Sequence, residues 1–208
     1  MVGLPGSGKS YLLKELSNEK YDIYDEENFY YKCEEIKKIN KIYTFIKCLL
    51  IFFDVYFLLF CYSIFNSNNK KYSIKNFVAF TKYLPLYSII LKLTNKDKIF
   101  DQGIIQYIWS LSFFNNKSNN GFLYYCMKKC ARKYNIIIIY YKVPLQIITK
   151  RIKSRKVKSD LDKLELNELK RIYSIHLNDY KFFLNKKMKY KIIESKEDFL
   201  RWLFYEKG

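Results

Sequence analysis

The hydrophobic and polar residues of this chain form two kinds of segment, short apolar runs and longer amphipathic stretches. Short runs rich in Ile, Tyr and Phe, at residues 21–24, 98–101, 135–141 and 190–193, are typical of β-strands. The run 135–141 is the strongest of them, and its continuous apolar character predicts a strand covered on both faces. Between these runs lie amphipathic segments that predict helices. Strands alternating with helices indicate an α/β fold, a three-layer α/β/α sandwich with a mostly parallel sheet.

Most of the remaining chain is predicted to be helical. A first helix is expected over residues 9–16, and a large helical insertion over about residues 30–95, interrupted by a polar loop at 66–70 and kinked or broken near Pro85. A capping-box-like start at Ser195 and Asp198 introduces the last helix. The other predicted helices span residues 104–114, 122–134, 145–152, 160–185 and 195–205.

Residues Thr44 to Phe65 form the most apolar stretch of the chain. Its length suggests a membrane span, because roughly 20 apolar residues cross a bilayer. Lys47 and Asp54 argue against a span, since a carboxylate at mid-membrane costs about 3 kcal/mol. We therefore expect a buried helix, or a helix that packs on a partner or a membrane surface.

Composition narrows the class of protein. The 208 residues favour one domain, 1–208, and an apolar fraction of 50% excludes a disordered chain. The net charge of +18 suggests nucleic acid or an anionic membrane, but the lysines are scattered rather than clustered, so we expect no dedicated nucleic-acid surface. Five cysteines without a C-x-x-C pair and a single histidine, His176, indicate a reducing, cytoplasmic location and no structural metal site.

The segment Gly3 to Ser10 carries the clearest chemistry. It matches G-x-x-x-x-G-K-[ST], in which glycines let backbone N–H groups surround a polyphosphate. Lys9 would bind the β- and γ-phosphates of ATP, and Ser10 would bind Mg²⁺. Only Met1 and Val2 precede the loop, so the strand expected before it is either clipped or very short. The expected nucleotide-binding residues are Gly3, Leu4, Pro5, Gly6, Ser7, Gly8, Lys9, Ser10 and Tyr11.

Three further positions are expected at the same edge of the sheet, where ligands bind in α/β folds. Asp25 follows a predicted strand, although it also belongs to an acidic cluster that a solvated turn would explain. Asp101 ends another strand and would hold Mg²⁺ through water or bind the acceptor, although it could also, or instead, cap the following helix. Arg151 and Arg155 share one helix face and suit phosphate oxygens, although a solvated basic face is the simpler alternative.

With these residues the chain resembles the P-loop nucleoside and nucleotide kinase-like family. The resemblance implies that Asp25 contacts or deprotonates the acceptor hydroxyl, and that about residues 145–160 form an arginine lid. It also implies that the helical region, about 30–95, binds the acceptor. One position differs, because Gln102 replaces the arginine that commonly follows the carboxylate at Asp101. An unusual acceptor, carbohydrate-like or lipid-proximal, is therefore our hypothesis.

The sequence thus predicts a kinase that transfers the γ-phosphoryl group of Mg-ATP to a small acceptor, a nucleoside, nucleotide or sugar-like molecule. Lys9, Asp25, Arg151 and Arg155 are its expected catalytic residues, and Ser10 and Asp101 its expected metal ligands. The alternative is an ATP-binding or ATPase module that docks on a partner or membrane through the apolar segment. A degenerate or truncated kinase is a third possibility.

Overall fold

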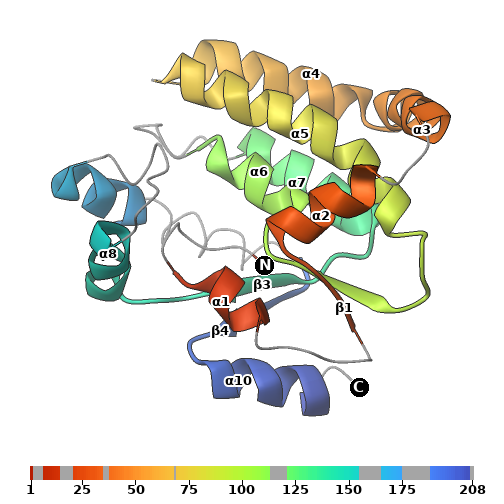
Figure 1. Ribbon diagram of the computed structural model, residues 1–208. Helices are drawn as coiled ribbons and strands as arrows, with labels where there is room; N and C mark the ends of the chain where they lie inside the picture. The colour runs from red at the N-terminus through yellow and green to blue at the C-terminus, as the bar shows by residue number, and fades with distance from the viewer. Residues whose placement is uncertain are drawn as a thin grey trace. The chain divides into compact units, whose positions relative to one another are not determined.

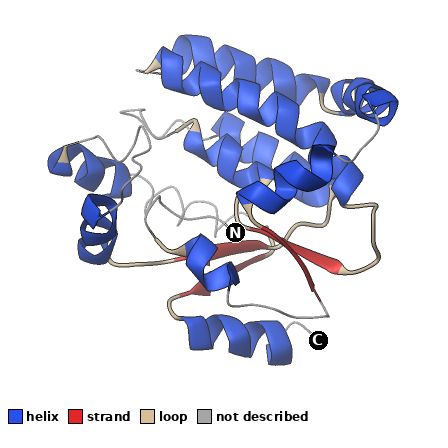
Figure 2. Cartoon of the chain, viewed as in Figure 1, coloured by secondary structure: helices blue, strands red, loops and turns tan. Residues whose placement is uncertain are grey.

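The computed structural model describes residues 1, 7–14, 21–34, 38–67, 69–112, 121–154, 165–174 and 188–206. The chain divides into two compact units, unit 1 with Met1–Leu16 and Ile137–Gly208, and unit 2 with Ser17–Ile136 (Figure 1). The structure is mixed α/β and mostly helical (70%). Its described strands form two separate parallel pairs rather than one continuous sheet (Figure 2). The prediction of an α/β chain with parallel strands is confirmed.

Unit 1 contains the first helix and the last third of the chain. Strands β3 (Ile138–Tyr141) and β4 (Tyr190–Ile193) pair in parallel, with Ile138 opposite Tyr190. Residues 166–174 are also helical. The core contains side chains from both ends of the chain, including Leu12, Leu13, Ile148, Ile193 and Phe199. The helices with printed bounds are α1 (Lys9–Lys14), α8 (Leu145–Ser154), α10 (Lys196–Arg201) and the π-helix η3 (Trp202–Glu206).

Unit 2 combines the other strand pair with most of the helices. Strands β1 (Tyr21–Tyr24) and β2 (Asp97–Phe100) are parallel, with Tyr24 opposite Phe100. Aromatic rings fill the core next to this pair, and Phe29 stacks on Tyr83 with 4.2 Å between ring centroids. The helices are α2 (Glu26–Glu34), α3 (Lys38–Ile51), α4 (Phe53–Cys61), the π-helix η1 (Tyr62–Asn66), α5 (Lys70–Ile90), α6 (Ile104–Ser110) and α7 (Gly121–Lys133).

Strand positions follow the sequence predictions closely, with one exception. The observed bounds of β1 and β4 equal the predicted ones, and β2 lies one residue earlier. Strand β3 begins three residues later than predicted, because Asn135 adopts a left-handed backbone (φ 49°) at the end of α7. The N–H of Ile136 then donates to the carbonyl oxygen of Ala131 (2.8 Å), which is the hydrogen bond of a helix-ending Schellman motif.

The long apolar stretch is bent rather than straight. Segments Asn40–Ile51 and Phe53–Asn66 meet at an angle of 78°, with the fully buried Phe52 between them. Among the described residues no single helix has the length and apolar composition of a membrane span, and this bent pair meets the criterion only when both halves are counted together. The expected burial holds for one side only, because Val55 and Leu59 are buried whereas many neighbours are exposed.

Helix α5 follows the polar loop that the sequence predicts at 66–70, and it differs from the prediction near its proline. It begins at Lys70 because the Asn69 side chain accepts a hydrogen bond from the N–H of Tyr72 (3.1 Å), which caps the first turn. It then continues through Pro85 to Ile90, so the helix does not end at the proline. The helical region predicted after β1 is therefore present, as a series of helices from α2 to α5.

Candidate functional site

Ser7 and Gly8 are the described residues of the loop that precedes α1. Gly3, Leu4, Pro5 and Gly6 lie outside the described residues. Gly8 has φ +93°, in a region that residues with a side chain rarely adopt. Helix α1 starts at the next residue, and the N–H of Leu12 donates to the carbonyl oxygen of Gly8 (3.0 Å). The change from glycine turn to helix thus falls between Gly8 and Lys9.

Two leucines fix the orientation of α1. Leu12 and Leu13 are almost fully buried, whereas Lys9 is half-buried and Ser10 and Tyr11 are exposed. Because the buried side of a helix faces the core, the side chains that the motif assigns to phosphate and Mg²⁺ remain accessible. Tyr11, which we also expected near the nucleotide, is 70% exposed.

Arg151 contacts this loop within unit 1. Its Nη1 donates to the carbonyl oxygen of Ser7 at 2.5 Å. A Cβ atom added to Gly8 would lie 2.8 Å from the same Nη1, so the guanidinium lies against the loop backbone. The Ser7 side chain is buried, and its Oγ has no hydrogen-bond partner among the described residues. Arg151 is therefore part of the loop's surroundings and not a purely solvated cation, while Arg155 lies outside the described residues.

Asp25 and Asp101 are brought together in unit 2. They follow β1 and β2 directly, and both strands end at the same edge because they are parallel and in register. The N–H of Asp101 donates to the carbonyl oxygen of Tyr24 (3.0 Å), which continues the pairing by one more hydrogen bond. Asp101 is 3% exposed and Asp25 is half-buried. The predicted convergence of two carboxylates at the carboxyl ends of neighbouring strands is confirmed for this pair.

The structural alternatives for these two carboxylates have different outcomes. Asp25 does have a structural role, since its Oδ1 accepts a hydrogen bond from the N–H of Asn28 (2.8 Å) at the start of α2. The helix-cap explanation for Asp101 is wrong, because Gly103 is the N-cap of α6 and no side chain caps that helix. Helix capping therefore accounts for part of the role of Asp25, but it does not account for the burial of Asp101.

One neighbour of the site was missed by sequence reasoning. The hydroxyl of Tyr83, on α5, donates to the carbonyl oxygen of Gln102 (2.5 Å) and so holds the turn that follows Asp101. No local signal in the sequence links these two residues, because they lie 19 positions apart and the tyrosine is one of 21. The contact positions Gln102, the residue that stands where the sequence analysis expected an arginine.

Cys126 and Cys130 are buried in helix α7. Burial is the largest influence on Cys126 and raises its pKa to about 12, and burial likewise raises the pKa of Cys130. Both thiols therefore stay protonated near neutral pH and behave as small core residues. In the part of the chain that the structure describes, no group of three or more His, Cys, Asp or Glu side chains could hold a metal ion. His176 lies outside that part.

The described site residues thus fall into two groups, one in each unit. Arg151 lies next to the loop that contains Ser7, Gly8, Lys9, Ser10 and Tyr11, and Asp25 and Asp101 lie at the strand ends. Similarity to known proteins does not extend this description. No protein family, no curated protein and no solved structure matches the chain.

Proposed function

We propose that this chain is an ATP-dependent phosphotransferase of the P-loop kinase type, which transfers the γ-phosphoryl group of Mg-ATP to a small acceptor. The observation that carries the proposal is the coincidence of motif and backbone at Gly8 and Lys9. A glycine-rich turn that matched the motif by chance would not be expected to combine a positive φ at Gly8 with a helix that starts at Lys9. Both features are what a phosphate-binding loop needs.

The loop's surroundings fit a polyphosphate. Lys9 would bind the β- and γ-phosphates, and the Ser10 hydroxyl would bind Mg²⁺, whose other ligands are mostly phosphate and water oxygens. Arg151 uses one N–H donor on Ser7 and has five in all, so further donors can bind phosphate oxygens. The buried Ser7 Oγ, which has no hydrogen-bond partner within the described ranges, adds a polar atom that a bound phosphate would satisfy. By resemblance, Arg155 would act with Arg151 as a lid.

The carboxylates suit the remaining roles. Asp101, buried at the end of β2, would hold Mg²⁺ through water, as the carboxylate at the end of such a strand does in this type of enzyme. Asp25 would orient or deprotonate the acceptor hydroxyl; its helix cap uses Oδ1, and a carboxylate accepts at both oxygens. The parallel pairing of every described strand supports the finer fold that belongs to this proposal, a mostly parallel sheet between layers of helices.

The acceptor is proposed to be carbohydrate-like or lipid-proximal rather than an ordinary nucleotide. Gln102 stands where kinases of nucleotides commonly place an arginine, and it lacks the charge that binds an acceptor phosphate. The helical region assigned to the acceptor is rich in apolar side chains, many of them exposed. A screen that found only ordinary nucleoside monophosphates as acceptors would exclude this part of the proposal.

The experiment is ADP release from Mg-ATP in the presence of pooled acceptors: nucleosides, nucleotides, sugars and polyols. We expect one pool to stimulate release, Lys9→Ala to abolish the stimulation, and Lys14→Ala to preserve it. Lys14 is the matched control because it lies on the same helix and is exposed. Stimulation that survives in Lys9→Ala contradicts the role of the loop.

A second candidate function is an ATP-binding module that docks through its apolar helices. The exposure of Leu50 (77%) and Phe53 (66%) favours docking but says nothing about catalysis. Binding of ATP without stimulation by any acceptor pool would favour this candidate over the kinase.

A further inference from the structure

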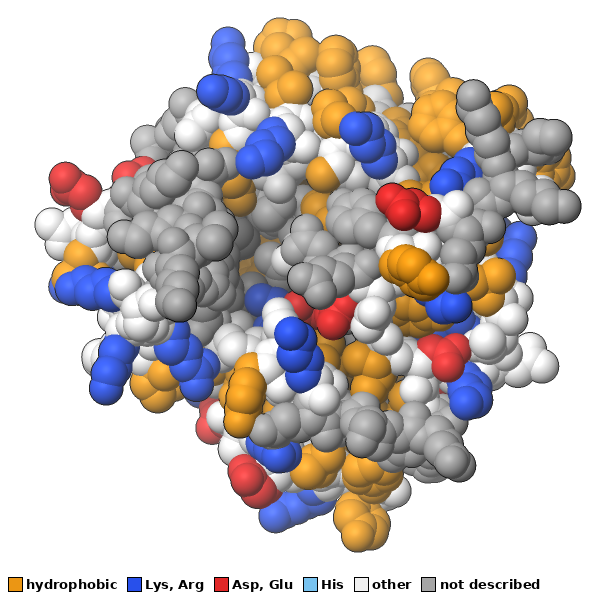
Figure 3. All heavy atoms as spheres, viewed as in Figure 1, with side chains coloured by type: hydrophobic (Ala, Val, Ile, Leu, Met, Phe, Trp, Pro, Cys, Tyr) orange, Lys and Arg blue, Asp and Glu red, His pale blue; other side chains and the backbone are white. Residues whose placement is uncertain are grey.

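Helices α3 and α4 expose an unusual number of large apolar side chains on unit 2. Leu50, Phe53, Phe57 and Phe65 are each more than half exposed. Hydrophobic atoms gather over these helices in the space-filling view (Figure 3). Isolated exposed apolar residues need no explanation, but a contiguous set indicates an interaction surface. We define the α3–α4 face by its exposed residues: Ile42, Tyr43, Phe45, Ile46, Leu49, Leu50, Phe53, Phe57, Phe60 and Phe65.

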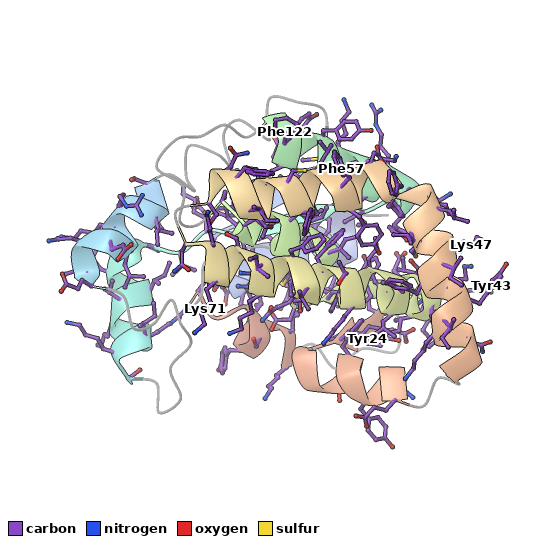
Figure 4. All side chains as sticks on the ribbon, turned by 90° about the horizontal axis from the view of Figure 1, so that it is seen from above. Tyr24, Tyr43, Lys47, Phe57, Lys71 and Phe122 are labelled. Atoms are coloured by element: carbon purple, nitrogen blue, oxygen red, sulfur yellow. The ribbon has the colours of Figure 1, made fainter. Side chains whose placement is uncertain are left out.

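The opposite sides of α3 and α4 pack in the core, so the α3–α4 face points away from it. On α4, Val55 and Leu59 are fully buried, and the Tyr56 ring packs edge-on against Phe80 of α5. On α3, Cys48 is the one fully buried side chain among those described. Figures 1 and 4 show α3 and α4 meeting at a corner. We infer that their exposed side chains belong to one surface.

The charge of this region is strongly one-sided. Residues 38–90 contain seven lysines and one acidic residue, Asp54. That single carboxylate is bound by Lys129 Nζ at 2.6 Å and by the hydroxyl of Tyr125, both on α7. Positive charge is therefore in excess in this region, and Lys47 of α3 and Lys71 at the start of α5 are exposed (Figure 4).

We propose that the α3–α4 face binds the surface of an anionic lipid bilayer, with both helices lying in the plane of the headgroups. Phenylalanine and leucine side chains enter the boundary between headgroups and acyl chains, and the lysines contact anionic headgroups. Aromatic and aliphatic residues on one side of a helix, with lysines beside them, are the composition of membrane-surface helices. The charge complementarity favours an anionic bilayer over a neutral one and over a second copy of this equally basic chain.

The test is flotation of the full-length protein with two kinds of vesicle, phosphatidylcholine alone and phosphatidylcholine mixed with phosphatidylserine. We expect binding to the mixed vesicles that weakens as salt is raised, and much weaker binding to the neutral ones. The double variant Leu50→Glu/Phe53→Glu should lose binding. Tyr31→Glu should retain it, because Tyr31 is an equally exposed aromatic residue on α2, outside the face.

A second pair of variants tests the charge alone. Lys47→Gln and Lys71→Gln should each weaken binding to the mixed vesicles about fivefold, whereas Lys14→Gln should not. If circular dichroism shows that Leu50→Glu/Phe53→Glu does not fold, the lysine substitutions test the proposal in its place. Flotation is measured without ATP and without an acceptor, so its result does not depend on whether the chain transfers a phosphoryl group.

Three results would overturn the proposal. The first is a folded wild-type protein that floats with neither vesicle. The second is equal binding to both vesicles, or binding that Leu50→Glu/Phe53→Glu leaves unchanged. The third is a wild-type protein that binds no vesicle but forms a dimer without lipid, where Leu50→Glu/Phe53→Glu dissociates the dimer. That result would identify a second copy of the chain as the partner of this face.

Discussion

The guanidinium of Arg151 donates a hydrogen bond to the carbonyl oxygen of Ser7, a residue 144 positions earlier in the chain. This contact ties α8 to the loop that precedes Lys9, within unit 1. The proposed role of Arg151 needs such an arrangement, because a planar guanidinium can hold a backbone oxygen and still offer donors to a phosphate.

Substitution of Arg151 should therefore weaken ATP binding more than it weakens the fold. We expect Arg151→Ala to reduce ATP affinity at least tenfold and to lower the free energy of unfolding by about 1 kcal/mol. Isothermal titration calorimetry and urea unfolding measure the two effects. Lys153→Ala, an exposed cation on the same helix, should change neither. An Arg151→Ala protein with unchanged ATP affinity would show that the contact is purely structural.

Gly8→Ala should destabilise the protein and impair nucleotide binding. The positive φ at this position costs a residue with a side chain about 1–3 kcal/mol, and the new Cβ would displace the Arg151 guanidinium. Thermal unfolding should show a lower Tm. Gly121→Ala is the matched control, because a Cβ at Gly121 meets no atom within 4 Å and should be tolerated. Wild-type stability of Gly8→Ala would contradict the strained backbone at this position.

The two roles of Asp25 can be separated by substitution. Asparagine caps a helix as well as aspartate does, so Asp25→Asn should retain stability while losing the proposed activation of the acceptor hydroxyl. Asp25→Ala should lose both, with a stability loss of about 1 kcal/mol. Turnover and urea unfolding of the two variants give the comparison. If Asp25→Asn keeps full turnover, the residue is a helix cap and has no catalytic role.

The ion pair between Asp54 and Lys129 should make a small, pH-dependent contribution to stability. Burial tends to raise the pKa of Asp54, but hydrogen bonds from Lys129 and Tyr125 outweigh it, so the pKa is lowered from 3.8. The contribution is then present above about pH 4 and lost as the pH falls below that value towards the folded-state pKa. Both side chains are about one-third exposed, so we expect less than about 1 kcal/mol.

A double-mutant cycle of Asp54→Asn and Lys129→Met, followed by urea unfolding at neutral and acid pH, isolates this contribution. The coupling energy should be measurable at pH 7, smaller at pH 3, and should fall further as the pH is lowered through the folded-state pKa of Asp54. A coupling energy that is unchanged at pH 3 would mean that packing, rather than charge, joins α4 to α7.

The sequence predicted those parts of the fold that depend on local patterns. The strands β1 and β4 have the predicted bounds, and α1 begins where Gly-Lys-Ser indicates. The late start of β3 was not predicted, although Asn135 after a basic last turn is a recognisable helix-ending signal. The single-domain assignment and the finer sheet architecture remain predictions.

Other features depend on contacts between distant residues and have no local signal. The bend at Phe52 occurs where a fully buried phenylalanine joins two apolar helices, and the hydropathy of Thr44–Phe65 is continuous across it. The contact of Arg151 with Ser7 and that of Tyr83 with Gln102 likewise need the folded chain. The site residues were therefore predictable as candidates, but their hydrogen-bond partners were not.

The most direct measurement of the central claim follows the γ-phosphoryl group itself. Phosphorus NMR of Mg-ATP, incubated with the protein and the acceptor that stimulates ADP release, distinguishes transfer from hydrolysis. We predict a new phosphoester signal that grows in step with ADP and is missing in Lys9→Ala. Inorganic phosphate equal in amount to the ADP, with no phosphoester, would contradict the assignment of this chain as a kinase.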